Sequence, residues 1–429
     1  MRLYDTLTRR EHPLPPPPGP IRMYFCGPTV YARAHIGNAR PFVLGMWLRR
    51  WLRESGYDVT LVHNITDIND KIYAAAAGGS SAELAALATE WYLEDTGSFG
   101  LGMPDEVPKA TEYVPRIIDT IANLVERGFA YEADGDVYYR VSRFADYGRL
   151  SGRQHDEEAP RNPSEEEEPS ELKDDPRDFA LWKGHKEAED TWWDSPWGRG
   201  RPGWHIECSV MAEELLGPAF EIHGGGVDLV FPHHENEIAQ SHALGHDFAQ
   251  SWMHNGMLRF VGEKMSKSLG NVVTIRETLD EWGPETALML FLGAHWSKPM
   301  DYSDKTLAAA RARADGFREV FRNPSQPALA DAWERFAAAL EDDFNTPQAL
   351  AVMHEWRDHD LLRRALEMFG LGSLATPAEA PSELVLLAEQ REAARSERDF
   401  ETADRLREEI ERSGWEVRDV PEGFRLVPK

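Results

Sequence analysis

The chain has 429 residues, a formal net charge of −27, and 41% hydrophobic and 10% aromatic residues. This composition is typical of a globular protein of several domains and excludes wholesale disorder. Two cysteines cannot form a disulfide framework, no apolar run approaches the roughly 20 residues of a membrane span, and the N-terminus lacks a signal-peptide core, so we expect a cytoplasmic protein with no membrane partner.

The net charge argues against a nucleic-acid partner, because binding to phosphates relies on local positive potential. Much of the acidic excess, however, is concentrated in residues 155–178, which include Glu165 to Glu168 and are interrupted by prolines. Such a segment is typical of a solvated insert rather than a binding site. The total charge is therefore only weak evidence about partners.

The first elements in chain order predict a β-α-β unit. A strand over residues 21–26 follows the proline-rich run 13–20, a helix covers about 39–54, and a second strand covers 58–62. This order implies a right-handed crossover and a parallel sheet, with ligands beyond the carboxyl ends of the strands.

The next elements predict an insertion and then the second half of the sheet. Between Thr111 and Asp146 a helical segment precedes a strand at 135–141, and the sheet resumes near Gly203. We place the second half in the segments 220–223, 228–230 and 252–254.

From Ser303 onward the pattern becomes helical. The expected helices cover 306–322, 330–341, 347–369, 383–396 and 399–412, and a hairpin of 415–418 and 424–427 ends the chain. The predicted fold class is α/β: a Rossmann-type parallel-sheet domain over 1–300 with an insertion at about 105–200, a helical bundle over 301–375, and a small C-terminal α+β domain over 376–429.

Cys26, Cys208 and the run 231–237 supply soft and borderline metal ligands. Pro232 suits the first turn of a helix, and residues four apart share a face, so His233 and Glu237 can point at one ion while His234 and Glu235 point elsewhere. Thiolate, imidazole and carboxylate together favour zinc over magnesium or calcium. Two buried apolar cysteines and a polar helix face are the alternative interpretation.

Two short motifs suggest a nucleotide triphosphate. His35-Ile36-Gly37-Asn38 stands where the first strand's loop enters a helix, and Gly37 would let an adenine approach the backbone. Lys264-Met265-Ser266-Lys267-Ser268 can place mobile positive charge on a departing pyrophosphate. A capped helix start and a surface lysine loop are the respective alternatives.

Together these motifs resemble the cysteinyl-tRNA synthetases, a family of class I aminoacyl-tRNA synthetases. The resemblance covers essentially the whole chain and depends on six segments in order: residues 26–31, 35–38, 204–208, 223–226, 233–237 and 264–268. Two departures are Asn38 in the last position of the first nucleotide motif and a helical region after Asn345 that is shorter than usual. The second departure leaves the completeness of the tRNA-facing bundle open.

The resemblance implies that L-cysteine and ATP, accompanied by Mg²⁺, give cysteinyl-adenylate, and that the cysteine is then transferred to tRNA(Cys). Residues 1–300 would be the catalytic domain, 301–375 a tRNA-binding bundle and 376–429 an anticodon-binding-like domain of a monomer. One zinc ion per chain would select the cysteine thiolate. The implied residues are His35, Asn38, Lys264 and Lys267 for catalysis; Gly37, Gly225, Asp228 and Lys267 for ATP; Thr66 and Trp204 for cysteine; and Cys26, Cys208, His233 and Glu237 for zinc.

Two other functions are weighed against this one. A paralogous ligase would pass activated cysteine to a small amine, as in the mycothiol pathway, but a small acceptor needs no terminal helices and hairpin. A non-catalytic cysteine or nucleotide sensor would not need the paired lysines and four metal ligands.

Overall fold

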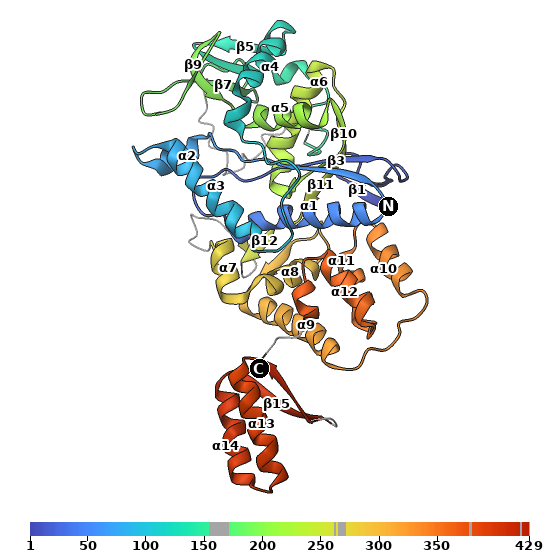
Figure 1. Cartoon of the computed structure of the whole chain (residues 1–429). Coiled ribbons are helices and arrows are strands. Elements are labelled where there is room, and N and C mark those ends of the chain that lie inside the picture. Colours follow the sequence, from blue (N-terminus) through green and yellow to red (C-terminus); the bar gives the residue numbers. More distant parts are fainter. Residues whose placement is uncertain (154–170, 261–262, 265–271, 377–379, 421–422, 429) are drawn as a thin grey trace.

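The computed structural model describes residues 1–153, 171–260, 263–264, 272–376, 380–420 and 423–428. Its centre is a parallel sheet of four strands in the order β11-β10-β3-β4 (Figure 1). The bounds of these strands are β3 (Pro20–Phe25), β4 (Asp58–His63), β10 (Ala219–Gly226) and β11 (Phe248–Asn255). The predicted α/β class is confirmed, whereas residues 228–230 are helical and do not belong to the sheet.

Alternating side chains of β3 pack against helices on opposite faces of the sheet. Met23 and Phe25 join the core that contains α1 (Ile36–Glu54), whereas Tyr24 and the following Cys26 pack with α5 (Trp204–Leu216) and α6 (Glu235–Leu244). Because successive side chains in a strand point to opposite faces, each residue of β3 contributes to one core only. Figure 1 shows α1 on the side of the sheet that faces the bundle and α5 and α6 on the other side.

The insertion is a five-stranded antiparallel sheet in the order β5-β6-β7-β9-β8, covered by α4 (Val114–Glu126). Its strands are β5 (Ala130–Ala133), β6 (Asp136–Tyr139), β7 (Phe179–Gly184), β8 (Trp193–Ser195) and β9 (Gly198–Pro202). Strand β9 runs through Gly203 directly into α5. The segment between β4 and the insertion holds α2 (Asp70–Ala76) and α3 (Ser81–Gly97).

Shorter elements complete the N-terminal part of the chain and connect it to the bundle. They are β1 (Arg2–Asp5), β2 (Arg10–Pro13), η1 (Ala110–Tyr113), η2 (Val141–Arg143), η3 (Val227–Leu229), η4 (Val230–His234), β12 (Leu258–Phe260), β13 (Glu263–Lys264), α7 (Ile275–Trp282), α8 (Pro284–Leu292) and β14 (Met300–Tyr302).

The bundle consists of α9 (Asp304–Arg322), α10 (Ala332–Glu341), α11 (Thr346–Glu355), α12 (His359–Met368) and η6 (Gly372–Ala375). The single periodic segment expected at 347–369 is two helices. Asp358 has extended backbone torsions and its carboxylate accepts the Leu361 N–H, so it caps a new helix rather than continuing the old one.

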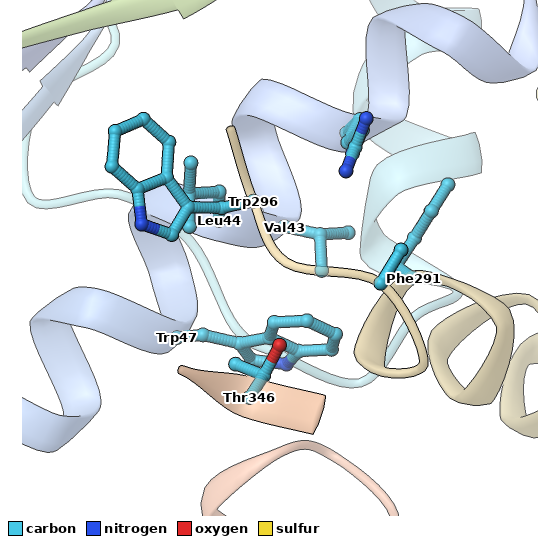
Figure 2. Close-up of a pocket in the computed structure, with 8 residues that line it drawn as sticks. Val43, Leu44, Trp47, Phe291, Trp296 and Thr346 are labelled. Atoms are coloured by element: carbon cyan, nitrogen blue, oxygen red, sulfur yellow. The ribbon is translucent and has the colours of Figure 1, made fainter. Parts of the chain in front are cut away.

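A small pocket lies where α1 meets the bundle. Val43, Leu44 and Trp47 of α1 line it together with Phe291, Trp296 and Thr346 (Figure 2). Its walls are mostly apolar, and it contains none of the residues predicted to bind substrate or metal.

The C-terminal unit pairs α13 (Ser382–Ser396) and α14 (Phe400–Arg412) with the hairpin β15 (Trp415–Val420) and β16 (Gly423–Pro428). The small core of the unit includes Ala388, Ile410 and Val417, and it lies at the opposite end of the molecule from the insertion (Figure 1). No helix in the part of the chain that the structure describes is long and apolar enough to span a bilayer.

Candidate active site

The site begins at the point where two neighbouring parallel strands send their crossovers in opposite directions. Strand β3 leads through α1 to β4 on one side, while β10 leads through α6 to β11 on the other. The Cys26 N–H donates to the Gly224 carbonyl oxygen at 3.0 Å across this gap. In open α/β sheets, this switch point is where ligands bind.

Glycine at position 224 is required by this close approach. A Cβ there would lie 2.4 Å from the Phe25 ring, which fills the space beside the strand. Gly224 therefore allows β10 to pack closely against β3.

Five donor side chains meet at the carboxyl ends of these strands. Ligand atoms of Cys26, His233, His234 and Glu237 all lie within 4.8 Å of one another and are buried. The Sγ atom of Cys208, from α5, lies 3.9 Å from that of Cys26. The Oε1 atom of Glu237 lies 3.1 Å from Nε2 of His233 and 3.9 Å from the Cys26 Sγ atom. All four predicted metal ligands are thus brought together.

The expectation that His234 points away from the cluster is wrong. Its Nε2 atom lies 3.3 Å from the Cys26 Sγ atom and 3.9 Å from the Glu237 Oε1 atom. Residues three apart share a helix face nearly as well as residues four apart, so the spacing to Glu237 suits both histidines. The chain also turns as η4 around a non-helical Phe231 before α6 begins at Glu235, one turn later than expected.

Glu235 does point elsewhere, as predicted. Its carboxylate accepts the backbone N–H groups of Leu150 and Ser151 at 3.4 and 2.8 Å.

Burial dominates the protonation of these donors. It raises the pKa of the Cys26 thiol well above the ordinary value and that of Glu237 to about 8, and it lowers the pKa of His233 to about 3. For Cys208, contact with Cys26 lowers the pKa, but burial and Glu237 raise it further, so the net shift is upward. Without a cation, the cluster is therefore neutral.

This donor set fits a tetrahedral zinc ion. With bonds of about 2.0–2.3 Å, zinc holds its ligand atoms roughly 3.3–3.8 Å apart. Four separations between donor atoms, from 3.1 to 3.9 Å, lie close to that range, and the donor atoms of Cys26, His233, His234 and Glu237 all lie within 4.8 Å of one another. Sulfur and neutral imidazole donors favour zinc over the hard cations, which prefer oxygen. A divalent charge would also stabilise the thiolate and carboxylate forms that burial disfavours.

Three further histidines contact side chains of the cluster. His205 and His233 place their Nδ1 atoms 2.9 Å apart, Nε2 of His223 lies 2.8 Å from Oε2 of Glu237, and Nε2 of His254 lies 2.7 Å from Nδ1 of His234. Such partners fix the orientation and tautomer of metal ligands. Sequence reasoning missed these three residues, although each follows or ends a predicted strand or begins a helix at the switch point.

Thr66 and Trp204 both lie near the donor cluster. The Trp204 ring stacks on His233 with centroids 4.1 Å apart, which places the indole directly beside the cluster. Thr66 is buried in the loop after β4 and forms a backbone bridge with Thr29, which lies three residues beyond Cys26. The Thr66 N–H donates to the Pro28 carbonyl oxygen at 3.1 Å. The structure therefore places both predicted cysteine contacts close to the metal ligands.

The first nucleotide motif opens α1. His35 is the N-cap residue, with extended backbone torsions, and the Asn38 N–H donates to its carbonyl oxygen at 2.9 Å. A Cβ at Gly37 would lie 2.8 Å from the His35 ring, so glycine lets that ring fold over the helix start.

The first nucleotide motif is joined through its backbone to residues 273–275, which follow the second motif in the sequence. His35 pairs with Thr274, the Ile36 N–H donates to Val273, and the Ile275 N–H donates to Ala34. Lys264 lies in β13, opposite Arg259 of β12. Lys267 lies outside the residues that the structure describes.

Gly225 and Asp228 form the end of β10 and the turn after it. A Cβ at Gly225 would lie 2.9 Å from Leu229 and 3.1 Å from His234, so the glycine permits close packing beneath the cluster. Asp228 lies in η3, and a Cβ on Gly226 would come within 2.3 Å of its carboxylate. These two of the four predicted ATP residues therefore lie at the carboxyl end of β10, next to His234 of the cluster.

Comparison with known proteins gives consistent matches over the whole chain. Residues 15–312 match the family described as the tRNA synthetases class I (C) catalytic domain, and residues 335–371 match the DALR domain. Cysteine–tRNA ligase of Cupriavidus pinatubonensis is 42% identical, with 99% of this chain and 98% of the relative covered. The ligase of Geobacillus thermodenitrificans is 41% identical with the same coverage of 99% and 98%.

Solved structures support the fold. Mycobacterium tuberculosis methionyl-tRNA synthetase in complex with methionyl-adenylate has a TM-score of 0.59 at 14% identity, with 83% of this chain and 88% of that chain covered. A ternary LeuRS–tRNA–LeuAMS complex from Agrobacterium radiobacter has a TM-score of 0.58 at 12% identity, with 84% and 82% covered.

Proposed function

We propose that this chain, which belongs to the class I cysteine–tRNA ligase family, is an ATP-dependent ligase that attaches L-cysteine to tRNA(Cys). The reaction would proceed in two steps, formation of cysteinyl-adenylate with release of pyrophosphate and then transfer of the cysteinyl group to the terminal adenosine of the tRNA. The buried thiol, imidazole and carboxyl cluster at the switch point of the sheet carries this proposal.

Cys26, Cys208, His233 and Glu237 would hold one zinc ion, and His234 offers a further nitrogen at the same place. When bound, the ion would supply a soft Lewis acid that takes the substrate thiolate as an added ligand. His205 and His223 would keep His233 and Glu237 in their binding orientations. Trp204 and Thr66 would close the sides of the pocket around the amino acid.

Metal recognition explains why the pocket would distinguish cysteine from serine. Differences in size and polarity in an ordinary pocket discriminate by only ~1–3 kcal/mol, which is too little for accurate protein synthesis. A neutral hydroxyl is a much poorer zinc ligand than a thiolate at neutral pH. The metal site would therefore make a separate editing reaction unnecessary.

The nucleotide would lie between the start of α1 and the end of β10. Oriented N–H groups at that helix start, together with His35 and Asn38, would stabilise phosphate oxygens, and Gly37 would admit the adenine. Gly225 and Asp228 would face the ribose. Lys264 and Lys267 would neutralise charge that grows on the departing pyrophosphate, with Mg²⁺ accompanying the ATP.

The bundle and the C-terminal unit support tRNA as the acceptor rather than a small amine. The match to the DALR domain falls on α10, α11 and α12, and the charged helices α13 and α14 with their hairpin form a separate unit beyond it. A small acceptor needs neither part. We expect the enzyme to act as a cytoplasmic monomer.

Cysteine-dependent exchange of pyrophosphate into ATP, followed by charging of purified tRNA, tests this function. We expect exchange with cysteine, none with serine, and near-stoichiometric zinc in the purified protein. Exchange without charging of any tRNA would instead favour the small-amine ligase. Absence of zinc in an active protein would remove the metal-based selection.

A further inference from the structure

A group of charged side chains joins the first half of the sheet to the insertion. Asp70, at the start of α2, lies 2.9 Å from the Lys183 ammonium of β7 and accepts a short hydrogen bond from the Arg201 guanidinium of β9. Arg201 also lies 3.3 Å from Glu189. Lys183 and Arg201 are register partners on adjacent strands, so one carboxylate bridges two cations.

A second set of contacts runs alongside this group. The Tyr73 hydroxyl donates to the Thr191 carbonyl oxygen at 2.8 Å, and the Ser81 N–H donates to the Asp190 carboxylate at 2.8 Å. The α2–α3 segment is therefore held to the loop before β8 as well as to β7 and β9.

The position of this junction relates it directly to the proposed cysteine pocket. Asp70 follows Thr66 by four residues, and Arg201 precedes Trp204 by three on the chain that runs from β9 into α5. Thr66 and Trp204 lie on different segments that are far apart in the sequence. The Asp70–Arg201 contact is a direct side-chain bridge between those two segments.

Glu207 of α5 is fully buried and interacts electrostatically with groups of both segments. Its partners are Asp67, which follows Thr66, and the cations Arg201 and Lys183. The same cations thus interact with carboxyl groups on both sides of the junction.

The burial of Arg201 makes the bridge sensitive to its partners. Its side chain is only 2% exposed, while that of Asp70 is 47% exposed. Without Asp70 the buried guanidinium would keep only Glu189 as a carboxylate partner, and incomplete compensation of a buried charge is destabilising. Loss of Asp70 would therefore shift β9 and the start of α5 relative to the loop that carries Thr66.

We propose that Asp70 is a positioning residue that sets the distance between the Thr66 and Trp204 walls of the cysteine pocket through Lys183 and Arg201. This inference depends on the proposed function, because it assigns the pocket to cysteine. Asp70 touches no reacting atom; it acts through the two segments that do line the pocket.

The test compares Asp70→Asn with wild type in the exchange assay, using the full-length zinc-loaded protein. Displacements of about 1 Å at a reactive site cost up to ~100-fold, so we expect the KM for cysteine to rise roughly 10-fold or more. The KM for ATP should change far less, because the ion pairs of Asp70 join it to β7 and β9 rather than to the proposed nucleotide site. Asp70→Glu keeps the charge and should recover most of the loss.

Asp194→Asn is the matched control. Asp194 of β8 pairs with Arg199 of β9 at 3.4 Å in the same insertion sheet, but both side chains are highly exposed and neither lies at the junction. We expect wild-type kinetics from this variant. Lys183→Gln provides a second perturbation of the junction that leaves Arg201 and Asp70 paired, and it should raise the cysteine KM by a smaller factor than Asp70→Asn.

The outcomes separate the two hypotheses. An active wild type whose Asp70→Asn variant shows an unchanged cysteine KM, or equal increases in the KM values for cysteine and ATP, would overturn the positioning role alone. A wild type that shows no cysteine-dependent exchange would remove the proposed function and this inference with it.

Discussion

Zinc binding should release nearly three protons per chain at pH 7. Burial keeps the thiols of Cys26 and Cys208 protonated, and a pKa of about 8 leaves the Glu237 carboxyl about nine-tenths protonated at that pH. The low pKa of His233 means that its imidazole is already neutral and has no proton to lose. The two thiols and most of the Glu237 carboxyl therefore account for the nearly three protons released.

The sign of the pH dependence follows from competition between zinc and protons. Each proton released adds one unit to the slope of log affinity against pH, so affinity should fall by about 1,000-fold from pH 7 to pH 6. Above the pKa of Glu237 its carboxyl is already ionised, and the slope should decline to about two near pH 9.

The number of protons released can be measured directly by isothermal titration of the metal-free protein with zinc. The titration is repeated in buffers of different ionisation enthalpy. Cys208→Ser should lower the count to about two, because serine carries no proton that zinc can displace under these conditions. Glu237→Gln should also lower the count to about two.

Glu235→Gln is the control for the carboxyl change. Glu235 is equally buried and lies two residues away on α6, but its carboxylate accepts N–H groups of Leu150 and Ser151 rather than facing the cluster. The number of protons that Glu235→Gln releases on zinc binding should stay near three. One proton or fewer from the wild type, or a count that Cys208→Ser leaves unchanged, would refute the assignment of both thiols as ligands.

Three further predictions concern the rest of the chain. Gly27→Ala would place a Cβ 1.7 Å from the Asn64 carbonyl oxygen, so its free energy of unfolding in urea should fall by about 3 kcal/mol or more. The control Gly97→Ala in α3 meets nothing within 4 Å and should be neutral or stabilising. Similar stability of the two variants would contradict this prediction. Lys267→Ala should slow adenylate formation in single-turnover measurements more than it weakens ATP binding; equal losses would assign it to ground-state binding. Deleting 383–429 should spare pyrophosphate exchange but sharply reduce tRNA charging and its salt dependence; undiminished charging by a folded truncation would exclude this unit from tRNA recognition.

Several arginines of the C-terminal unit pair with acidic side chains. Arg391 and Arg395 both pair with Asp419, and Arg418 pairs with Glu319 of the bundle and with Glu416. These cations stabilise the unit and its attachment to α9. Fewer arginines would therefore be available to contact RNA than their number in the sequence suggests.

Local pattern determined much of the architecture by itself. Alternating and helical periodicity located β3, α1 and β4 to within a few residues, because side-chain spacing within a strand or helix is fixed by its own backbone. The same reasoning placed His233 and Glu237 on one face, as their side-chain contact shows. Local periodicity was insufficient at 347–369, where the Asp358 cap divides the predicted helix in two.

Only the tertiary structure decided which distant residues meet. Cys26 and Cys208 are 182 positions apart and come together because β10 lies beside β3 and α5 packs on that face of the sheet. The inclusion of His234, the supporting histidines and the bridge from Asp70 to Arg201 depend on the same packing. A sequence specifies the chemistry of each side chain and the geometry of its own turn, whereas distances between segments are set by how whole elements bury their apolar faces against one another.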